Sequence, residues 1–437
     1  MSNIKYKLRY IEWYLTAILY EIYMKIGYSK IVQRNKLFEI LTYAQKHVPY
    51  FRDLLGGIKF SEDNVFEIIR DLPLLDKSII REQKRRVFSD AITSDWPYWH
   101  NTGGSTGNPL KFPLHTIHPL LADKEMVHQM MLYRKMGYKP GDHICSIDGR
   151  RVSESEVDSG IFWGYNPTNF PYGIEHFSTV YLNDKTAVDY INKFNSVTPA
   201  FLRGYPSGIK TICDYIQTLN LKLDFKLKGV YLTSENFDIN LCQYVSNTFN
   251  CPVWGQYGHS EVSVFGYRKP NEKKYYLFPL YGYAEILDSN NNHVHKGEQG
   301  EIVVTGFNNF GLPFIRYKTG DLAVYGGTLP NGTLVIDNLL GRSADYLIDN
   351  ESNKKYLVGL IFGGHLHAFD VIKQWQIEQT EIGYIKVRIV KDSNWCKSTE
   401  SEIKDFFVAN NFNVEIEYVD FIEKTNRGKQ MFLIQHL

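Results

Sequence analysis

Hydrophobic positions change their spacing along the chain, and each spacing is typical of one kind of element. Up to about residue 90 they recur at helical intervals, which predicts helices over Ile4–Tyr28 and Asn35–Lys46 and after Ser61. From there to about residue 265, short apolar runs alternate with helical stretches such as Thr186–Asn195 and Ser207–Leu219. This rhythm predicts a largely parallel sheet covered by helices. Its buried strands are expected at His143–Ile147, Ala200–Leu202, Gly229–Leu232 and Pro252–Trp254.

The last third of the chain shows two further patterns of hydrophobic and turn residues. Between residues 275 and 336, strand patterns separated by Gly and Asn turns predict a β-rich subdomain. After Gly341-Arg342, strand patterns and one helix, Thr399–Asn410, predict a small α+β domain. The sequence therefore predicts an α/β fold with a large domain over residues 1–341 and a small, mobile C-terminal domain over residues 342–437.

Composition and charge narrow the function classes. A net charge of +1 over 437 residues gives no global field that would attract nucleic acid or acidic lipid. The five cysteines form no CxxC pair, which favours free thiols in a reducing cytosol and a cytoplasmic protein. The apolar run Trp13–Tyr20 is too short to span a bilayer. We expect its helix to dock on the protein's own core, with peripheral membrane contact as the alternative.

A glycine-rich loop is the most informative local segment. Asn101–Pro109 contains three glycines and three hydroxyl side chains, and such a loop lets backbone N–H groups approach a polyphosphate closely. It lacks the GxxxxGK spacing of a Walker A loop, and a strand pattern at Lys111–Leu114 follows it. The candidate phosphate ligands are Thr102, Gly103, Gly104, Ser105, Thr106 and Gly107.

Four more motifs follow this loop in a fixed order. They are Tyr257–Glu261, Pro313–Asp321, Leu340–Arg342 and Arg427–Lys429. In this order and at these intervals, the five segments resemble the core motifs of the acyl-adenylate-forming superfamily, which contains acyl-CoA synthetases, luciferases and peptide-synthetase adenylation domains. The form of Pro313–Asp321 is similar to that of the phenylacetate–CoA ligase branch.

Within that branch, three segments resemble CapK-type proteins of capsular polysaccharide biosynthesis. They are Gly204–Ser207, Thr233–Glu235 and Gln374–Gln379, and the Gly-Lys ending resembles the same subgroup. The resemblance implies a ligase that uses ATP and Mg²⁺ to activate a small-molecule carboxylate as its acyl-AMP and that releases pyrophosphate. It also implies an acceptor, so far unidentified, for the activated acyl group.

The resemblance implies nucleotide-binding roles for matching residues. Tyr257, with Gly258, would pack on the adenine, and Asp321 would accept hydrogen bonds from the ribose hydroxyls. Arg342 would lie by the ribose and phosphate at the domain junction. Glu261 would bind Mg²⁺, which prefers carboxylate and phosphate oxygens.

The remaining roles concern the reacting groups. Thr106 would contribute a hydroxyl to the phosphates, and Lys429 would bridge the carboxylate and the α-phosphate, so that Thr106, Glu261 and Lys429 form the catalytic set. The substrate pocket is expected at Tyr205, Ser234, Glu235 and His259. The pair His365 and His367 has no third ligand at a recognisable spacing, so we interpret it as part of a loop.

The chain departs from the family pattern after Gly341-Arg342. Ala344 stands where thioester-forming members carry an acidic hinge residue, and the polar turn Asp349–Lys355 replaces a glycine-rich segment. CoA use is therefore in question, and we expect the acyl group to pass to an amine or a sugar. Three alternatives stay open: an acyl-CoA ligase, a catalytically silent nucleotide-binding subunit, and transfer of AMP to a cofactor.

Overall fold

The chain forms two compact units, each built from two separate stretches of sequence. The computed structural model describes residues 2–92, 98–101, 110–114, 124–342, 345–357, 360–361, 368, 372–392, 395–423 and 429–437. Unit 1 comprises residues 1–141 and 254–339, and unit 2 comprises residues 142–253 and 340–437. The chain leaves unit 1 for the last time between Leu339 and Leu340. The domain boundary at 341/342 stays a prediction.

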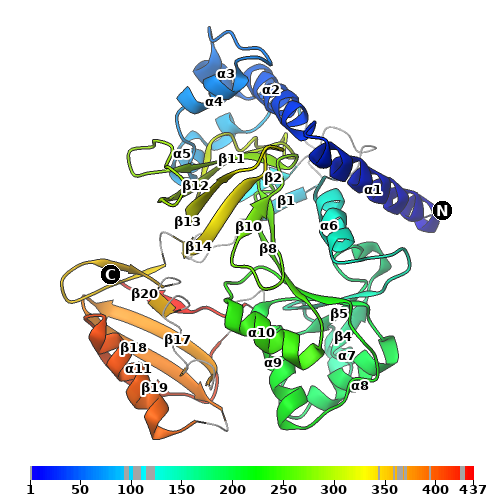
Figure 1. The fold of residues 1–437 in the computed structure, drawn as a ribbon, viewed down its shortest axis with the longest axis vertical. Coiled ribbons are helices and arrows are strands. Elements are labelled where there is room, and N and C mark those ends of the chain that lie inside the picture. The colour runs from blue at the N-terminus through cyan, green and yellow to red at the C-terminus, as the bar shows by residue number, and fades with distance from the viewer. Residues whose placement is uncertain are drawn as a thin grey trace. The chain divides into compact units, whose positions relative to one another are not determined.

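Unit 1 begins with the helices that the periodicity predicted (Figure 1). The first predicted helix ends at Lys25, and Gly27, with a φ of +77°, turns the chain into the next helix. Asp76 caps α5 by accepting a hydrogen bond from the Ile79 N–H. The helices are α1 (Ser2–Lys25), α2 (Ser29–His47), α3 (Pro49–Leu55), α4 (Val65–Asp71), α5 (Lys77–Gln83), the 3₁₀ turn η1 (Lys84–Val87) and α6 (Lys124–Lys135).

The strands of unit 1 form the predicted β-rich part. In sheet order they are β11 (Gly282–Leu287), β12 (Gln299–Gly306), β13 (Tyr317–Thr328), β14 (Leu334–Arg342), β10 (Tyr275–Leu277), β9 (Phe265–Arg268) and β8 (Val253–Gly258). The strand pairs β11–β12, β12–β13, β14–β10, β10–β9 and β9–β8 are antiparallel. A separate antiparallel pair joins β1 (Tyr98–Asn101) to β2 (Lys111–Leu114). The apolar side chains of α2 to α5 pack on this sheet in one core.

The first part of unit 2 is the predicted parallel sheet. Its strands run in the order β7 (Gly229–Leu232), β6 (Phe201–Gly204), β3 (Ile144–Asp148), β5 (Glu175–Ser178) and β4 (Trp163–Tyr165). All pairs are parallel except the edge pair β5–β4. The helical elements are α7 (Glu154–Asp158), η2 (Pro167–Asn169), α8 (Ala187–Val197), α9 (Pro206–Thr218) and α10 (Ile239–Phe249). The expectation of a helix-covered parallel sheet is confirmed.

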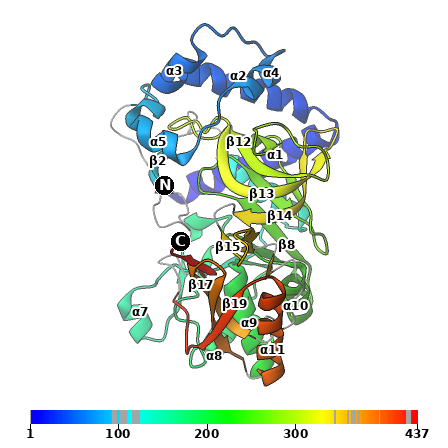
Figure 2. The same ribbon diagram turned by 90° about the vertical axis from the view of Figure 1, so that its left-hand side faces the viewer.

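The second part of unit 2 is a four-stranded sheet with one helix. The strands run in the order β19 (Asn413–Tyr418), β18 (Tyr384–Lys391), β17 (Ile372–Glu381) and β20 (Leu433–Gln435). Helix α11 (Lys397–Ala409) lies along one face of this sheet, as Figures 1 and 2 show, and Ile403 and Phe407 bury its apolar side. A short pair, β15 (Tyr346–Ile348) and β16 (Lys354–Tyr356), precedes the sheet. This combination of strands and one helix is the predicted α+β arrangement.

Candidate functional site

The hairpin β1–β2 holds the ends of the glycine-rich loop. Asn101 and Lys111 are cross-strand partners, so the loop joins two paired strands, as predicted. Phe112 is fully buried, and its ring lies edge-on to Phe314 at 5.2 Å between ring centroids, which attaches the hairpin to the third motif. Residues 102–109 lie outside the described residues, so the phosphate roles of Thr102–Gly107, including Thr106, stay predictions.

Two predicted nucleotide-binding residues meet in unit 1. The Tyr257 hydroxyl, at the end of β8, donates a 2.8 Å hydrogen bond to Oδ2 of Asp321 on β13. The Asp321 backbone N–H donates to Oγ1 of Thr319 at 3.1 Å, which fixes the turn before the carboxylate. A carboxylate has about four acceptor positions, so the bond from Tyr257 does not saturate Asp321.

The predicted magnesium ligand lies in a tight cluster in the same unit. Glu261 is 5% exposed and accepts a 3.2 Å hydrogen bond from the hydroxyl of the fully buried Tyr317. Nδ1 of His259 lies 3.3 Å from Oε2 of Glu261. Burial raises the pKa of Glu261, but interaction with His259, a backbone hydrogen bond and the charge of Lys77 together outweigh it and lower this pKa to about 2. Glu261 is therefore an anion throughout the physiological pH range.

The loop that carries Glu261 is strained and closely packed. Val262 has a φ of +55°, which is unusual for a β-branched residue, and its N–H donates to the His259 carbonyl at 3.2 Å. Gly282 and Gly306 are cross-strand partners on β11 and β12. A Cβ at Gly306 would lie 2.6 Å from Ser263 Cβ, and one at Gly282 would lie 2.2 Å from the Ser263 carbonyl oxygen. These glycines let the loop sit directly on the sheet.

We expect the substitution Gly306→Ala to displace this loop. The new Cβ would overlap Ser263, so overpacking should lower the free energy of unfolding by about 1–3 kcal/mol. Chemical denaturation measures this loss. Adding Ser263→Gly removes the nearest atom and should restore part of the stability, as a double-mutant cycle would show. Equal stability of Gly306→Ala and the unsubstituted protein would refute the packing argument.

The arginine of the third motif supports the fold. Arg316 is buried at a φ of +51°, and its guanidinium pairs with the fully buried side chain of Glu285 at 3.2 Å and donates to the Leu72 carbonyl. Its own carbonyl accepts from the Leu75 N–H at 3.0 Å. Arg316 therefore holds the extended segment before α5 against the motif, a role for which the local sequence gives no signal.

A second cluster of predicted residues forms in unit 2. The Lys429 ammonium lies 5.6 Å from the centre of the Tyr205 ring, within cation–π range. The N–H of the next residue, Gln430, donates to Oε1 of Glu235 at 3.0 Å. Glu235 also accepts from the Ser207 N–H at 2.9 Å and from its hydroxyl at 3.0 Å. The carboxylate of Glu235 thus ties the segment that carries Lys429 to the start of α9.

The structure also describes the other predicted residues of unit 2. Burial raises the pKa of Glu235, while the bonds from Ser207 and Gln430 act against the increase. Ser234 is exposed at a φ of +73°, and Arg342 is the half-buried last residue of β14. The predicted site residues are divided between the two units. Unit 1 contains Tyr257, Gly258, His259, Glu261 and Asp321, and unit 2 contains Tyr205, Ser234, Glu235, Arg342 and Lys429. Five residues singled out from the sequence lie outside the described residues: Ala344, His365, His367, Arg427 and Gly428.

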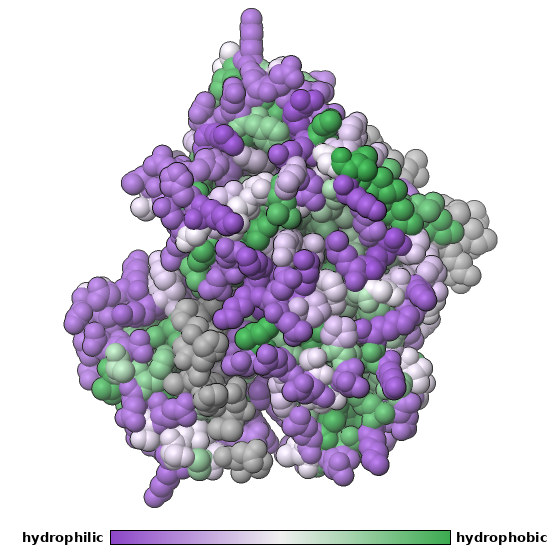
Figure 3. Space-filling model, viewed as in Figure 1, coloured by the Kyte–Doolittle hydropathy of each residue, from purple (hydrophilic) through white to green (hydrophobic). Residues whose placement is uncertain are grey.

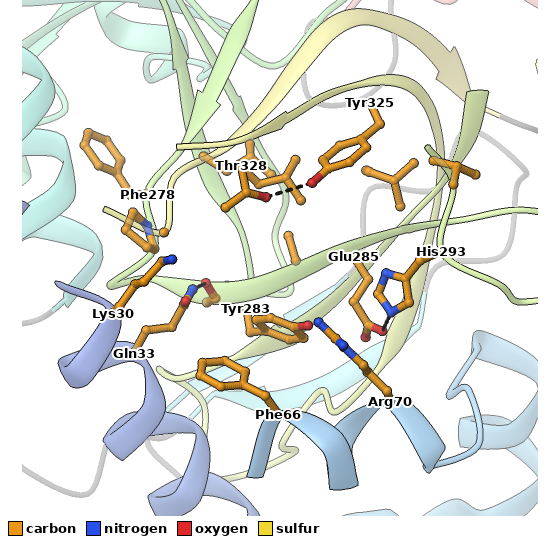
Figure 4. A pocket seen from close by; sticks show the side chains of 18 residues that line it. Lys30, Gln33, Phe66, Arg70, Phe278, Tyr283, Glu285, His293, Tyr325 and Thr328 are labelled. Carbon is orange, nitrogen blue, oxygen red and sulfur yellow. Dashed lines mark hydrogen bonds and ion pairs between the residues drawn. The ribbon is translucent and has the colours of Figure 1, made fainter. Parts of the chain in front are cut away.

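Unit 1 also contains a hollow of about 560 Å³ away from these motifs (Figure 4). Arg70, Glu285 and His293 gather at one end, and Lys30 and Gln33 from α2 lie at the other. Its floor is apolar, and among the described residues the motif positions do not line it. Glu285, the carboxylate at the polar end, is already paired with Arg316 and His293. We assign the hollow no ligand.

One group of metal-type donors lies in unit 2. Donor atoms of His143, Cys145 and Glu175 lie within 4.8 Å of one another. The Lys193 ammonium is 3.2 Å from Oε1 of Glu175 and already balances its charge. The group is therefore best described as a buried ion-pair network.

Comparison with known proteins agrees with the motifs. Residues 351–436 match the family model of the CapK C-terminal domain. The protein CapK of Staphylococcus aureus is 25% identical over 97% of this chain and 96% of its own length. The structure resembles a 2-hydroxyisobutyryl-CoA ligase in the postadenylation state, with a TM-score of 0.69, 16% identity and coverage of 92% of this chain and 89% of the ligase.

A second solved structure gives the same result at lower similarity. An anthranilate-CoA ligase in complex with anthranoyl-AMP has a TM-score of 0.50 at 14% identity, and the match covers 76% of this chain and 65% of the ligase. At these identities the structures establish the fold. The chain therefore has the fold of the acyl-adenylate-forming ligases and is similar to CapK along almost its whole length, as its motifs predicted.

Proposed function

We propose that this protein is a ligase that activates a small carboxylate as its acyl-AMP, using ATP and Mg²⁺ and releasing pyrophosphate. The bond between Tyr257 and Asp321, in the same unit as the ionised Glu261, carries the proposal. An aromatic ring and an adjacent carboxylate suit a nucleoside, because the ring offers an apolar face and the carboxylate accepts from both ribose hydroxyls. The fold and the order of the motifs support the same chemistry.

The donor chemistry at Glu261 fits Mg²⁺. A hard cation prefers an ionised carboxylate, and Glu261, with a pKa of about 2, is ionised at neutral pH. Tyr317 orients one carboxylate oxygen by donating to Oε1. Bound Mg²⁺ would neutralise phosphate charge during attack of the carboxylate.

Lys429 is the proposed cation for the reacting groups. Glu235 holds the backbone next to it, and the Tyr205 ring lies beside its ammonium, so its position is constrained from two sides. An ammonium placed there would stabilise negative charge that develops between carboxylate and α-phosphate. The resemblance to CapK supports transfer of the acyl group to an acceptor of surface-polysaccharide biosynthesis, with CoA use in question.

The proposal is tested by ATP–pyrophosphate exchange. Purified protein with ATP, Mg²⁺ and a panel of carboxylic acids should exchange labelled pyrophosphate with at least one acid, and hydroxylamine should trap that acid as its hydroxamate. Exchange that needs no acid would favour AMP transfer to another group, and its absence with every acid would favour a silent nucleotide-binding subunit. Turnover that requires CoA would identify an acyl-CoA ligase.

Asp321→Ala should mainly weaken ATP binding. One hydrogen bond to a charged group contributes about 1.5–3 kcal/mol, so the Kd for ATP should rise by roughly 10- to 100-fold. Isothermal titration calorimetry measures it. Tyr257→Phe is the matched control, because it removes only the hydroxyl that reaches Asp321 and keeps the aromatic face. The nucleotide role of Asp321 fails if Asp321→Ala binds ATP as tightly as the unsubstituted protein.

A further inference from the structure

Helix α1 has two apolar faces, and among the described residues only one of them packs on the protein. Trp13 and Ala17 are buried on the side that faces α6. On that side Glu21 pairs with Arg134 at 3.1 Å and the hydroxyls of Tyr10 and Tyr138 hydrogen-bond at 3.1 Å. These contacts fix the rotation of the helix about its axis. The side chains that point the other way are therefore displayed in a defined direction.

The outward side of the helix carries an aliphatic stripe. We define the stripe as Ile11, Leu15, Leu19, Ile22 and Ile26, which are each between 43% and 67% exposed. Their spacings of four, four, three and four residues place them in one line along the helix surface. At 1.5 Å per residue the line is about 22 Å long. Figure 3 shows hydrophobic side chains gathered along the outer side of α1.

The charge around the stripe indicates its partner. Residues 1–47, which hold α1 and α2, contain eight Lys or Arg and three Glu, a net charge of +5. The whole chain carries +1, so the rest of it carries −4. Two of these charges are paired with residues outside the segment: Glu21 with Arg134, and Arg34 with Glu62 and Asp63. The chain therefore concentrates its positive charge in its two N-terminal helices, the first of which carries the exposed aliphatic stripe.

We propose that α1 lies on an anionic lipid surface, with the aliphatic stripe inserted between headgroups and the basic residues of the two helices held near lipid phosphates. An apolar line along one side of a helix, in a segment of net positive charge, is the pattern of an interfacial helix. Docking a second copy through the same stripe would bring two segments of charge +5 together, which like-charge repulsion disfavours. Among the residues that the structure describes, no helix is both long and apolar enough to cross a bilayer. The helix would thus rest on the surface.

Vesicle co-sedimentation of the full chain tests this proposal. Vesicles of phosphatidylcholine containing about a third phosphatidylglycerol should bind the protein, and vesicles of pure phosphatidylcholine should bind it about tenfold more weakly. The double substitution Leu15→Gln and Leu19→Gln should lower binding to the anionic vesicles by at least about tenfold. It should leave the unfolding temperature unchanged, because both side chains are exposed and Gln is a good helix former.

The matched control replaces two aliphatic residues elsewhere that are at least as exposed as Leu19. Val408→Gln on α11 with Ile382→Gln in the β17–β18 turn changes side chains that are 61% and 56% exposed, and this variant should bind vesicles like the unsubstituted protein. The proposal is overturned if the unsubstituted protein does not bind anionic vesicles, or if both double variants bind these vesicles equally well. A dimer in analytical ultracentrifugation that is lost in Leu15→Gln/Leu19→Gln, without vesicle binding, would instead identify a second copy as the occupant.

Discussion

Lys429→Ala is expected to abolish most adenylation while leaving ATP binding nearly normal. If the ammonium stabilises charge that develops only during the reaction, its removal should lower kcat by about 10²–10³, as loss of an oxyanion donor does. The binding of ATP should change little, since the nucleotide contacts proposed at Tyr257 and Asp321 remain. Pyrophosphate exchange measures the first quantity and calorimetry the second.

Unit 2 offers a matched control for this substitution. Lys354 on β16 also lies over a tyrosine ring, with its ammonium 4.3 Å from the centre of the Tyr346 ring, but it belongs to none of the motifs. Lys354→Ala removes a similar cation–π contact and should keep full activity. If Lys429→Ala retains full exchange, or if the two variants lose activity alike, Lys429 is not the catalytic cation.

Glu261→Gln is expected to have the second largest effect. The substitution preserves the shape of the side chain but removes the charge that Mg²⁺ would require, so kcat/KM should fall by roughly 10² or more. Half-saturation should also need much more Mg²⁺. Because the pKa of Glu261 is about 2, this group should impose no pH dependence on the Mg²⁺ requirement between pH 6 and 8.

The substitution Tyr317→Phe tests the hydrogen bond that orients Glu261 without removing the carboxylate itself. It leaves the Glu261 charge and removes the hydroxyl that donates to Oε1, so the apparent affinity for Mg²⁺ should fall by about 10- to 100-fold with less effect on kcat. A graded series, with Glu261→Gln more severe than Tyr317→Phe, would support the assignment. A Mg²⁺ requirement that is identical in all three proteins would show that Glu261 does not bind the metal.

Local patterns in the sequence predicted the elements and the positions of the motifs. Helical spacing predicted α2, and strand-like runs predicted β3, β6 and β7, because each pattern depends on residues close in the chain. The first helix was predicted three residues too long, since its apolar spacing continues through Ile26 although the helix ends at Lys25. Motif order predicted the fold that the solved ligases share.

The side-chain partnerships could not be predicted in this way. Tyr317 reaches Glu261 across 56 residues, and Gln430 reaches Glu235 across 195. Such pairs depend on strand order and register, which no local spacing encodes. Arg316 looked like one residue of a nucleotide motif, but its contacts with Glu285 and Leu72 show that it holds the fold together.

The products of ATP turnover test the central claim most directly. ATP labelled at the α-phosphate, incubated with the protein, Mg²⁺ and the acid identified by hydroxamate trapping, should yield one equivalent of pyrophosphate and labelled acyl-AMP, which hydroxylamine should convert to labelled AMP and the hydroxamate. Adenylation breaks the bond between the α- and β-phosphates, so the label must stay in acyl-AMP or AMP and none should appear in ADP. Release of ADP and inorganic phosphate would contradict the proposal.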